Sequence, residues 1–221
     1  MKCLYPIAEK DLYVFTLEPI DSKMYCMLHN NRALIIDPCI SVLAKQFLLK
    51  HKVKDITVIL THEHIDHISG VNMLREIAKC KVICSEKCAE RIVDSRKNAA
   101  AYFEGMYSMR TVNELEQIKA LKLSNYTCCA DKTFKEKIEF EWYGLNFKCI
   151  EMPGHSPGGI VIIVNNKYIF SGDNYMLGEK VITRLPGGSK KDYEKYIKPF
   201  FKNISSGCVI YPGHGSCVKI G

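Results

Sequence analysis

Long apolar runs are missing from this sequence of 221 residues. No run approaches the ~18 apolar residues that a membrane-spanning helix needs. The opening MKCLYPIAEKDL meets charge by Glu9 and holds no apolar segment of the kind found in secretion signals. We therefore expect a soluble, cytoplasmic protein without a membrane partner.

Clustered positive charge is also missing, although the net charge is +7. The lysines are spread over residues 45–54, 79–87 and 190–202, as on solvated helix faces. A nucleic-acid groove calls for basic residues on one face, interleaved with aromatic ones. The composition thus argues against a nucleic-acid partner, and the excess charge mildly favours a small anionic substrate.

A disulfide framework is not expected either. The cysteine count of 11 is odd, the chain is not small, and no export signal precedes it, so reduced thiols are expected. With 47% hydrophobic and 25% charged residues, the chain suits a single globular domain over residues 1–221. Its oligomeric state is left open.

Histidines are concentrated in THEHIDHISG, residues 61–70, directly after the apolar run 56–60 that predicts a buried strand. In an extended chain, residues two apart point the same way, so His62 and His64 can face one ion. Asp66 and His67 follow as the chain enters a helix predicted over 66–79. Two ligand pairs that point in different directions suit two ions, and imidazole and carboxylate groups are typical ligands of zinc, iron or manganese.

Short apolar runs between turn residues predict the other elements. We expect strands at 13–17, 24–28, 33–37, 81–84, 137–141, 145–152, 160–164, 167–171 and 208–211, and helices at 41–50, 85–93 and 189–203. Residues 95–123 hold no strand signal and predict a helical insertion. Its large apolar side chains either roof a substrate pocket or simply pack; they are Tyr102, Phe103, Met106, Tyr107 and Met109.

Further candidate ligands lie at the ends of other predicted strands. His155 stands in PGHSPGG (153–159), Asp173 in SGD (171–173) and His214 in YPGHG (211–215). Sites commonly assemble where several strands end at one edge. Asp37, after the apolar residues 34–36, is a candidate hydrogen-bond acceptor for a ligand histidine.

With these four motifs in this order, the chain resembles the metallo-β-lactamase superfamily, and within it the single-domain hydrolases similar to glyoxalase II. The resemblance implies an α/β fold, a four-layered αββα sandwich. It also implies two metal ions, the first held by His62, His64 and His155, the second by Asp66, His67 and His214, with Asp173 bridging them.

Three features depart from the resemblance. Glyoxalase II continues into a C-terminal helical domain that helps to hold glutathione, whereas this chain ends at Gly221, soon after His214. Arg184 stands in a loop where relatives often carry an acid, and either meets a substrate carboxylate or phosphate or lies on the surface. Cys39 stands where relatives tend to have glycine, and the sequence assigns it no role.

We therefore expect a binuclear metal-dependent hydrolase with two divalent ions. Zinc is the leading candidate for both ions, and iron or manganese are the alternatives. Asp66 is expected to orient the nucleophile and relay a proton, and Tyr175 either donates to the substrate carbonyl or forms a wall. A thioester is the leading substrate, ahead of a lactone or a phosphodiester. Two further alternatives are a mononuclear-iron sulfur dioxygenase and, least favoured, a metal-stabilised binding module without catalysis.

Overall fold

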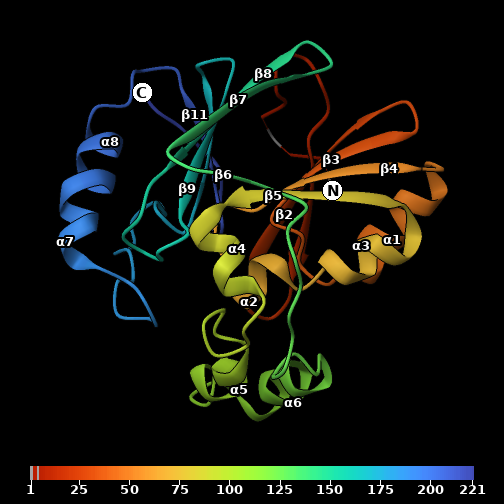
Figure 1. The fold of residues 1–221 in the computed structure, drawn as a ribbon, viewed down its shortest axis with the longest axis vertical. Helices are drawn as coiled ribbons and strands as arrows, with labels where there is room; N and C mark the ends of the chain where they lie inside the picture. Colours follow the sequence, from red (N-terminus) through yellow and green to blue (C-terminus); the bar gives the residue numbers. More distant parts are fainter. Residues whose placement is uncertain (1, 4) are drawn as a thin grey trace.

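Two six-stranded sheets pack face to face, with helices on both outer faces (Figure 1). The computed structural model describes residues 2–3 and 5–221. The first sheet has the order β1 (Tyr13–Leu17), β2 (Ser22–His29), β3 (Arg32–Ile36), β4 (Asp55–Ile59), β5 (Lys79–Ser85) and β6 (Lys132–Phe134). The second has the order β12 (Val218–Lys219), β11 (Val209–Pro212), β10 (Tyr168–Gly172), β9 (Ile160–Val164), β8 (Leu145–Glu151) and β7 (Lys137–Trp142).

The helices form the outer layers. The helices of the first half of the chain are α1 (Val42–Lys50), α2 (Ile65–Ile68), α3 (Val71–Ile77), α4 (Glu86–Ile92), η1 (Ala100–Tyr102), α5 (Phe103–Met106) and α6 (Val112–Ala120). Those of the second half are α7 (Lys190–Asp192), η2 (Tyr193–Ile197) and α8 (Lys198–Lys202). Figure 1 places α1, α3 and α4 beside the first sheet and α7 and α8 beside the second. The predicted αββα sandwich is thereby confirmed.

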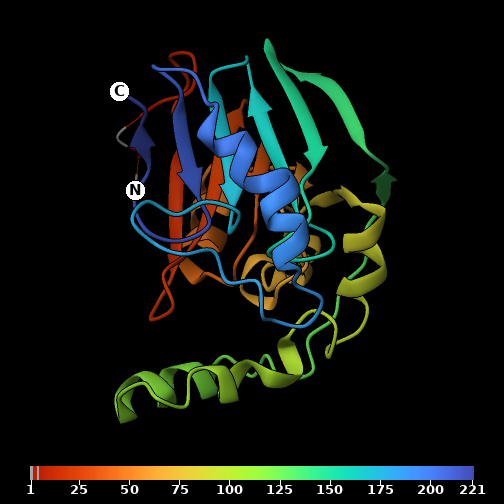
Figure 2. The same ribbon diagram turned by 90° about the vertical axis from the view of Figure 1, so that its left-hand side faces the viewer.

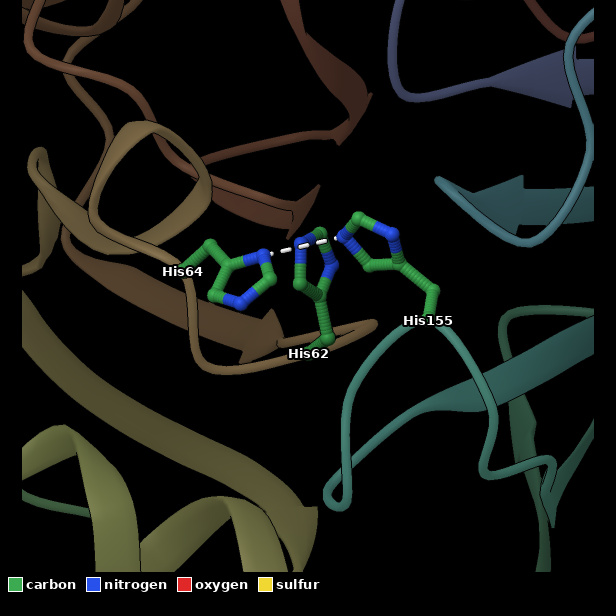
Figure 3. Close-up of side chains that lie close together, drawn as sticks. All are labelled: His62, His64 and His155. Carbon is green, nitrogen blue, oxygen red and sulfur yellow. Dashed lines mark hydrogen bonds between the residues drawn. The ribbon is translucent and has the colours of Figure 1, made fainter. Parts of the chain in front are cut away.

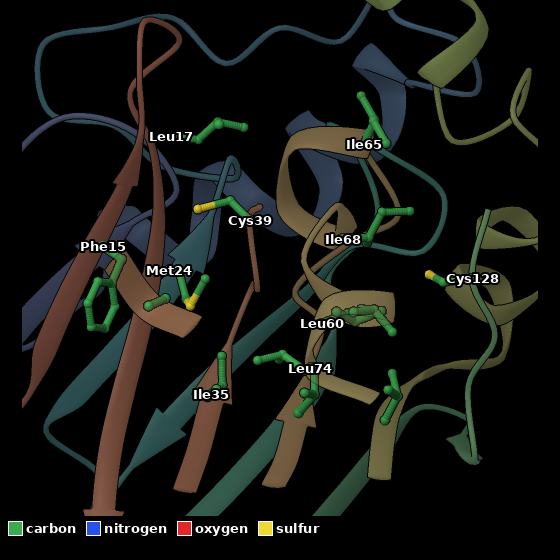
Figure 4. Close-up of a cluster of buried hydrophobic side chains, with 14 of the residues drawn as sticks. Phe15, Leu17, Met24, Ile35, Cys39, Leu60, Ile65, Ile68, Leu74 and Cys128 are labelled. Atoms are coloured by element: carbon green, nitrogen blue, oxygen red, sulfur yellow. The ribbon is translucent and has the colours of Figure 1, made fainter. Parts of the chain in front are cut away.

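Alternating side chains along the strands build the layers of the core. In β3, Ile35 packs with the helices of the first outer layer, whereas Leu34 and Ile36 pack between the sheets. Figure 4 shows Ile35 among the side chains of that first helical layer. In β9, Ile162 lies between the sheets and Val161 faces the layer of α7, η2 and α8. Strands covered on both faces carry continuous apolar sequences, which is why the runs 33–36 and 160–164 contain no polar residue.

The helix predicted over 66–79 is interrupted, and that prediction was wrong in its extent. The chain forms α2, breaks at Ser69 and Gly70, and resumes as α3, while Lys79 already belongs to β5. A Cβ atom on Gly70 would lie 2.5 Å from the carbonyl oxygen of Cys39, so the backbones touch here. The backbone nitrogen of Gly70 donates to the Pro38 carbonyl at 2.8 Å. Because of this break, the backbone after α2 packs closely against the chain at the end of β3, and this contact positions α2 and its site residues.

The helical insertion predicted near 95–123 is present as η1, α5 and α6. In Figure 2 it extends as an arm beyond the sandwich. Thr111 and Glu114 form a capping box that starts α6, and Phe103 and Ile118 anchor the arm in the first helical layer of the core. Among the described residues, no helix combines the length and apolar character needed to cross a bilayer.

Candidate metal centre

The loop between β4 and α2 carries four of the predicted ligands. His62 and His64 lie in the extended stretch, and His64 is the N-cap of α2 with φ −64° and ψ 145°. Asp66 and His67 follow within α2, and all four side chains are buried. The change from extended to helical backbone turns the second pair in a different direction from the first.

Three histidines form the first cluster (Figure 3). His155 approaches from the loop after β8, opposite the loop of His62 and His64. Its Nε2 lies 2.9 Å from Nδ1 of His64, and the ring centroid of His62 lies 4.7 Å from that of His64. One ligand nitrogen from each of the three residues lies within 4.8 Å of the other two. Three imidazoles in this arrangement can bind one ion.

A carboxylate and two histidines form the second cluster. Oδ2 of Asp66 lies 3.2 Å from Nε2 of His67 and 3.1 Å from Nε2 of His214. Asp173 lies between the clusters, because its Oδ1 is 3.3 Å from Nε2 of His67 and its Oδ2 is 3.5 Å from Nε2 of both His155 and His214. The structure thus brings all seven predicted ligands together.

Asp37 orients two of these histidines. Its carboxylate accepts hydrogen bonds from the backbone nitrogen of Thr61 at 2.6 Å and from the Thr61 hydroxyl. It also lies 3.2 Å from Nδ1 of His67, which must carry a proton to donate to it. The Thr61 hydroxyl, having donated to Asp37, accepts from Nδ1 of His62 at 3.1 Å. The prediction that Asp37 accepts from a ligand histidine is confirmed, and in both rings Nε2 is the nitrogen that faces the cluster and is left to bind a metal.

Backbone carbonyls orient two more histidines in the same way. Nδ1 of His155 donates to the carbonyl of Ile182 at 2.8 Å, and Nδ1 of His214 donates to the carbonyl of Ile20 at 3.0 Å. Their Nε2 atoms therefore point inward, and in the neutral rings these atoms carry the lone pairs that can bind a metal. Nε2 of His62 is buried and has no hydrogen-bond partner among the described residues. Converging lone pairs and an unsatisfied buried nitrogen fit a bound cation.

Burial controls the charge of the first cluster. It lowers the pKa of His64 to about 3 and the pKa of His62 well below its ordinary value, so both rings are neutral and able to bind a metal. Burial acts to raise the pKa of Asp66, but the charges and hydrogen bonds of His67 and His214 together outweigh it and hold that pKa well below its usual range. The first cluster therefore supplies neutral imidazoles, and the second cluster supplies an ionised carboxylate.

A glycine allows Asp173 to approach the second cluster. A Cβ atom on Gly213 would collide with Oδ1 of Asp173 and would lie 2.7 Å from Cε1 of His67. The backbone of Gly213 also joins the sheets, since its carbonyl accepts from the Lys23 nitrogen and its nitrogen donates to Gly172. Only a residue without a side chain fits between these groups.

Five of the seven residues line the floor of a cavity of about 350 Å³, namely His64, Asp66, His155, Asp173 and His214. Apolar side chains form most of its walls, including Met106 and Tyr107 of the arm and Ile182 and Leu185 of the loop after β10. Of the two alternatives that the sequence left open for the arm, roofing a pocket holds for Met106 and Tyr107. Phe103 is buried in the core instead, and Met109 is 97% exposed.

Two predicted substrate residues are not brought to the cavity. The ring of Tyr175 stacks on Phe201 with centroids 4.8 Å apart and lines a separate hollow, so it is not placed to donate to a substrate carbonyl. Arg184 is exposed and does not line the cavity. The cavity instead contains Arg110, which sequence reasoning missed because residue 110 lies in the arm, far from every motif.

A histidine and aspartate centre at the strand ends of an αββα sandwich defines the class of metallo-β-lactamase folds. The chain belongs to the β-lactamase superfamily, since the family model described as "Beta-lactamase superfamily domain" matches residues 32–173. It is 26% identical to hydroxyacylglutathione hydrolase GloC of Haemophilus influenzae over 166 residues, which are 74% of this chain and 70% of that protein.

Solved structures share the fold. The BLEG-1 B3 metallo-β-lactamase superposes with a TM-score of 0.76 at 23% identity, covering 95% of this chain and 94% of the other. TTHA1623, solved in a di-iron-bound form, gives a TM-score of 0.67 at 21% identity with 94% of each chain covered. The family, the fold and the histidine and aspartate clusters together indicate a hydrolase that uses a divalent metal.

Proposed function

We propose that this protein is a hydrolase that holds two divalent metal ions and cleaves a small activated acyl substrate, a thioester foremost. One observation carries the proposal: two adjacent ligand clusters, with Asp173 within 3.5 Å of both. The first ion would be held by His62, His64 and His155, and the second by Asp66, His67 and His214. Zinc suits these ligands, and iron or manganese are alternatives.

Bound divalent ions at such a centre lower the pKa of water and polarise a carbonyl group. The chain contributes the remaining steps. We assign to Asp66 the roles of orienting the attacking water and passing its proton to the leaving group, which its position at the cavity floor and its 8% exposure support. A substrate that fills the cavity against its apolar walls would exclude bulk water from the floor, which strengthens the electrostatic interactions there.

The cavity supports a small substrate with an apolar body. Its volume of about 350 Å³ is at the small end for ligand sites. A thiolate leaves without a dedicated general acid, so Asp66 alone suffices for proton transfer to a thioester product. The similar GloC protein is, by its name, a hydrolase of hydroxyacylglutathione, which is an activated acyl compound.

A substrate panel with metal analysis on the same sample tests the proposal. Thioesters, lactones, aryl esters and phosphodiesters are offered to protein purified without chelator, and oxygen uptake is followed in parallel. Thioester hydrolysis that disappears with chelator and returns with zinc is expected. One iron per chain with oxygen-dependent turnover would instead identify a dioxygenase, and a protein that hydrolyses nothing in the panel would be a binding module.

A further inference from the structure

Glu63 stands between the two metal-facing histidines of the first loop, and the proposed chemistry does not use it. Its side chain is 0% exposed. Oε1 accepts from Nε of Arg91 at 2.6 Å, and Oε2 accepts from the backbone nitrogen of Gly158 at 3.1 Å. A fully buried carboxylate is costly unless both oxygens are satisfied, so this arrangement needs both donors.

Arg91 extends this contact to two further segments. Its Nη2 donates to the carbonyl of Pro186 at 2.8 Å and to the carbonyl of Lys97 at 3.0 Å. Pro186 belongs to the same loop as Ile182, whose carbonyl accepts from the ring of His155. The guanidinium group therefore connects the first histidine loop to the segment that orients His155.

One face of α4 docks against the loop of His155. Ser85, Cys88 and Arg91 are three residues apart and so lie on the same side of the helix. The Ser85 hydroxyl caps the helix at Cys88 and donates to the carbonyl of Gly158 at 2.8 Å. A Cβ atom on Gly158 would lie 2.5 Å from both Cα of Cys88 and Oε2 of Glu63, so the loop is pressed directly onto the helix.

We propose that Glu63 and Arg91 form a positioning clamp that sets the separation between the loop of His62 and His64 and the loop of His155. The two loops leave strands of different sheets, so neither sheet alone fixes their separation. The backbone nitrogen of Ile160 donates a hydrogen bond to the Thr61 carbonyl at 2.8 Å, which holds the loop of His62 and His64 at its start. The clamp holds the same loop at Glu63, between the two histidines. The inference rests on the proposed metal site and assigns the clamp no contact with substrate.

Glu63→Gln is the sharpest test variant because it keeps the shape of the side chain. A glutamine has one accepting oxygen, so it can accept from Arg91 or from Gly158 but not from both. Arg91→Lys is the second variant. It keeps the positive charge, but a lysine ammonium lacks the planar guanidinium group that donates to Glu63 and to the carbonyls of Pro186 and Lys97 together.

Asp131→Asn is the matched control. Asp131 pairs with Arg75 at 2.7 Å and accepts from the backbone nitrogen of Val82, so it also ties two segments through one carboxylate. It contacts none of the ligands in the described structure.

Cobalt(II) is the probe, because its visible absorption reports coordination geometry without any turnover. Each metal-free variant is titrated with cobalt, its affinity is measured by competition with a chelator, and its melting temperature is measured in excess chelator. We expect Glu63→Gln and Arg91→Lys to weaken cobalt binding about 10-fold and to alter the spectrum, as loss of outer-shell support does. Asp131→Asn is expected to keep wild-type affinity and spectrum even if its melting temperature falls.

Wild-type affinity and spectrum in both clamp variants would overturn the clamp and leave the proposed function intact. Equal weakening in Asp131→Asn would also overturn it, because the effect would then be general destabilisation. Wild-type protein that binds no cobalt would overturn the proposed function and the clamp together. If Glu63→Gln does not fold, Arg91→Lys decides by the same criteria.

Discussion

Individual side chains at the floor of the cavity have separable duties. Four of the ligand histidines, His62, His67, His155 and His214, donate their Nδ1 protons to protein acceptors, so that Nε2 is the nitrogen left to bind a metal. Asp66 differs from them because it offers a carboxylate at the cavity floor, beside two imidazole nitrogens. We therefore expect proton transfer to depend on Asp66 more than on any other ligand of the second cluster.

Asp66→Asn should lower kcat by at least about 100-fold, because an amide cannot accept the proton that a general base takes from the attacking water. The fold should survive, since the substitution is isosteric and the backbone carbonyl of residue 66 keeps its hydrogen bond from Ser22. Steady-state kinetics together with circular dichroism checks both statements. Turnover close to that of the wild type would remove Asp66 from the mechanism.

Arg110 is the residue we expect to select an anionic substrate group. It is the one lysine or arginine among the described residues that line the cavity. Its Cζ lies 5.9 Å from the ring centroid of Tyr107, and its Nη1 lies 3.2 Å from Oε1 of Glu114, which holds the guanidinium at the arm. Asp21 and Glu179 also line the cavity, so an anionic group should bind on the Arg110 side.

Arg110→Ala should raise KM about 10-fold for an acyl substrate with a terminal carboxylate, since a charge-assisted hydrogen bond is lost. KM for the matched neutral substrate should stay unchanged. Arg184→Ala is the control, because Arg184 is exposed outside the cavity. Equal effects on both substrates, or an effect of Arg184→Ala alone, would contradict this role.

At the scale of elements, the arm formed by η1, α5 and α6 contributes a wall of the cavity without contributing a ligand. Its side chains divide into those that enter the cavity and those that face solvent. Met106 lines the cavity, whereas Met109 is 97% exposed. The arm should therefore affect substrate binding and leave metal binding unchanged.

Met106→Ala should raise KM several-fold for apolar acyl substrates while the metal content stays constant, because buried contact area with the substrate is lost. Met109→Ala, three residues away on the same arm, should change neither quantity. Kinetics and metal analysis on both variants check this. A change of metal content in Met106→Ala, with KM unaltered, would show that the arm supports the centre rather than the substrate.

The elements also show what sequence patterns can predict. The ligands could be located because each follows an apolar run directly, as His214 follows the strand ending at Pro212. The break of the helix at Gly70 could not be predicted from the sequence, because it arises from contact with the backbone of Cys39, which is remote in sequence. The direction of the Tyr175 side chain could not be predicted for the same reason, because the ring stacks on Phe201 in α8.

At the scale of the whole molecule, the centre joins the two halves of the sandwich. Ligands from the first sheet's loops meet His155, Asp173 and His214 from the ends of β8, β10 and β11. Buried polar atoms at this edge, such as Nε2 of His62 and Oδ1 of Asp173, have no hydrogen-bond partner among the described residues. Metal ions would satisfy such atoms from both halves at once, so the number of ions bound reports whether the two halves form one centre.

The most direct test is the metal content of protein purified without chelator, measured by elemental analysis for the wild type and for Asp173→Ala. The two-cluster arrangement predicts about two ions per chain in the wild type and a lower value in the variant, because Asp173 is the group that faces both clusters. A firm value of one ion per chain, unchanged in Asp173→Ala, would contradict the shared centre.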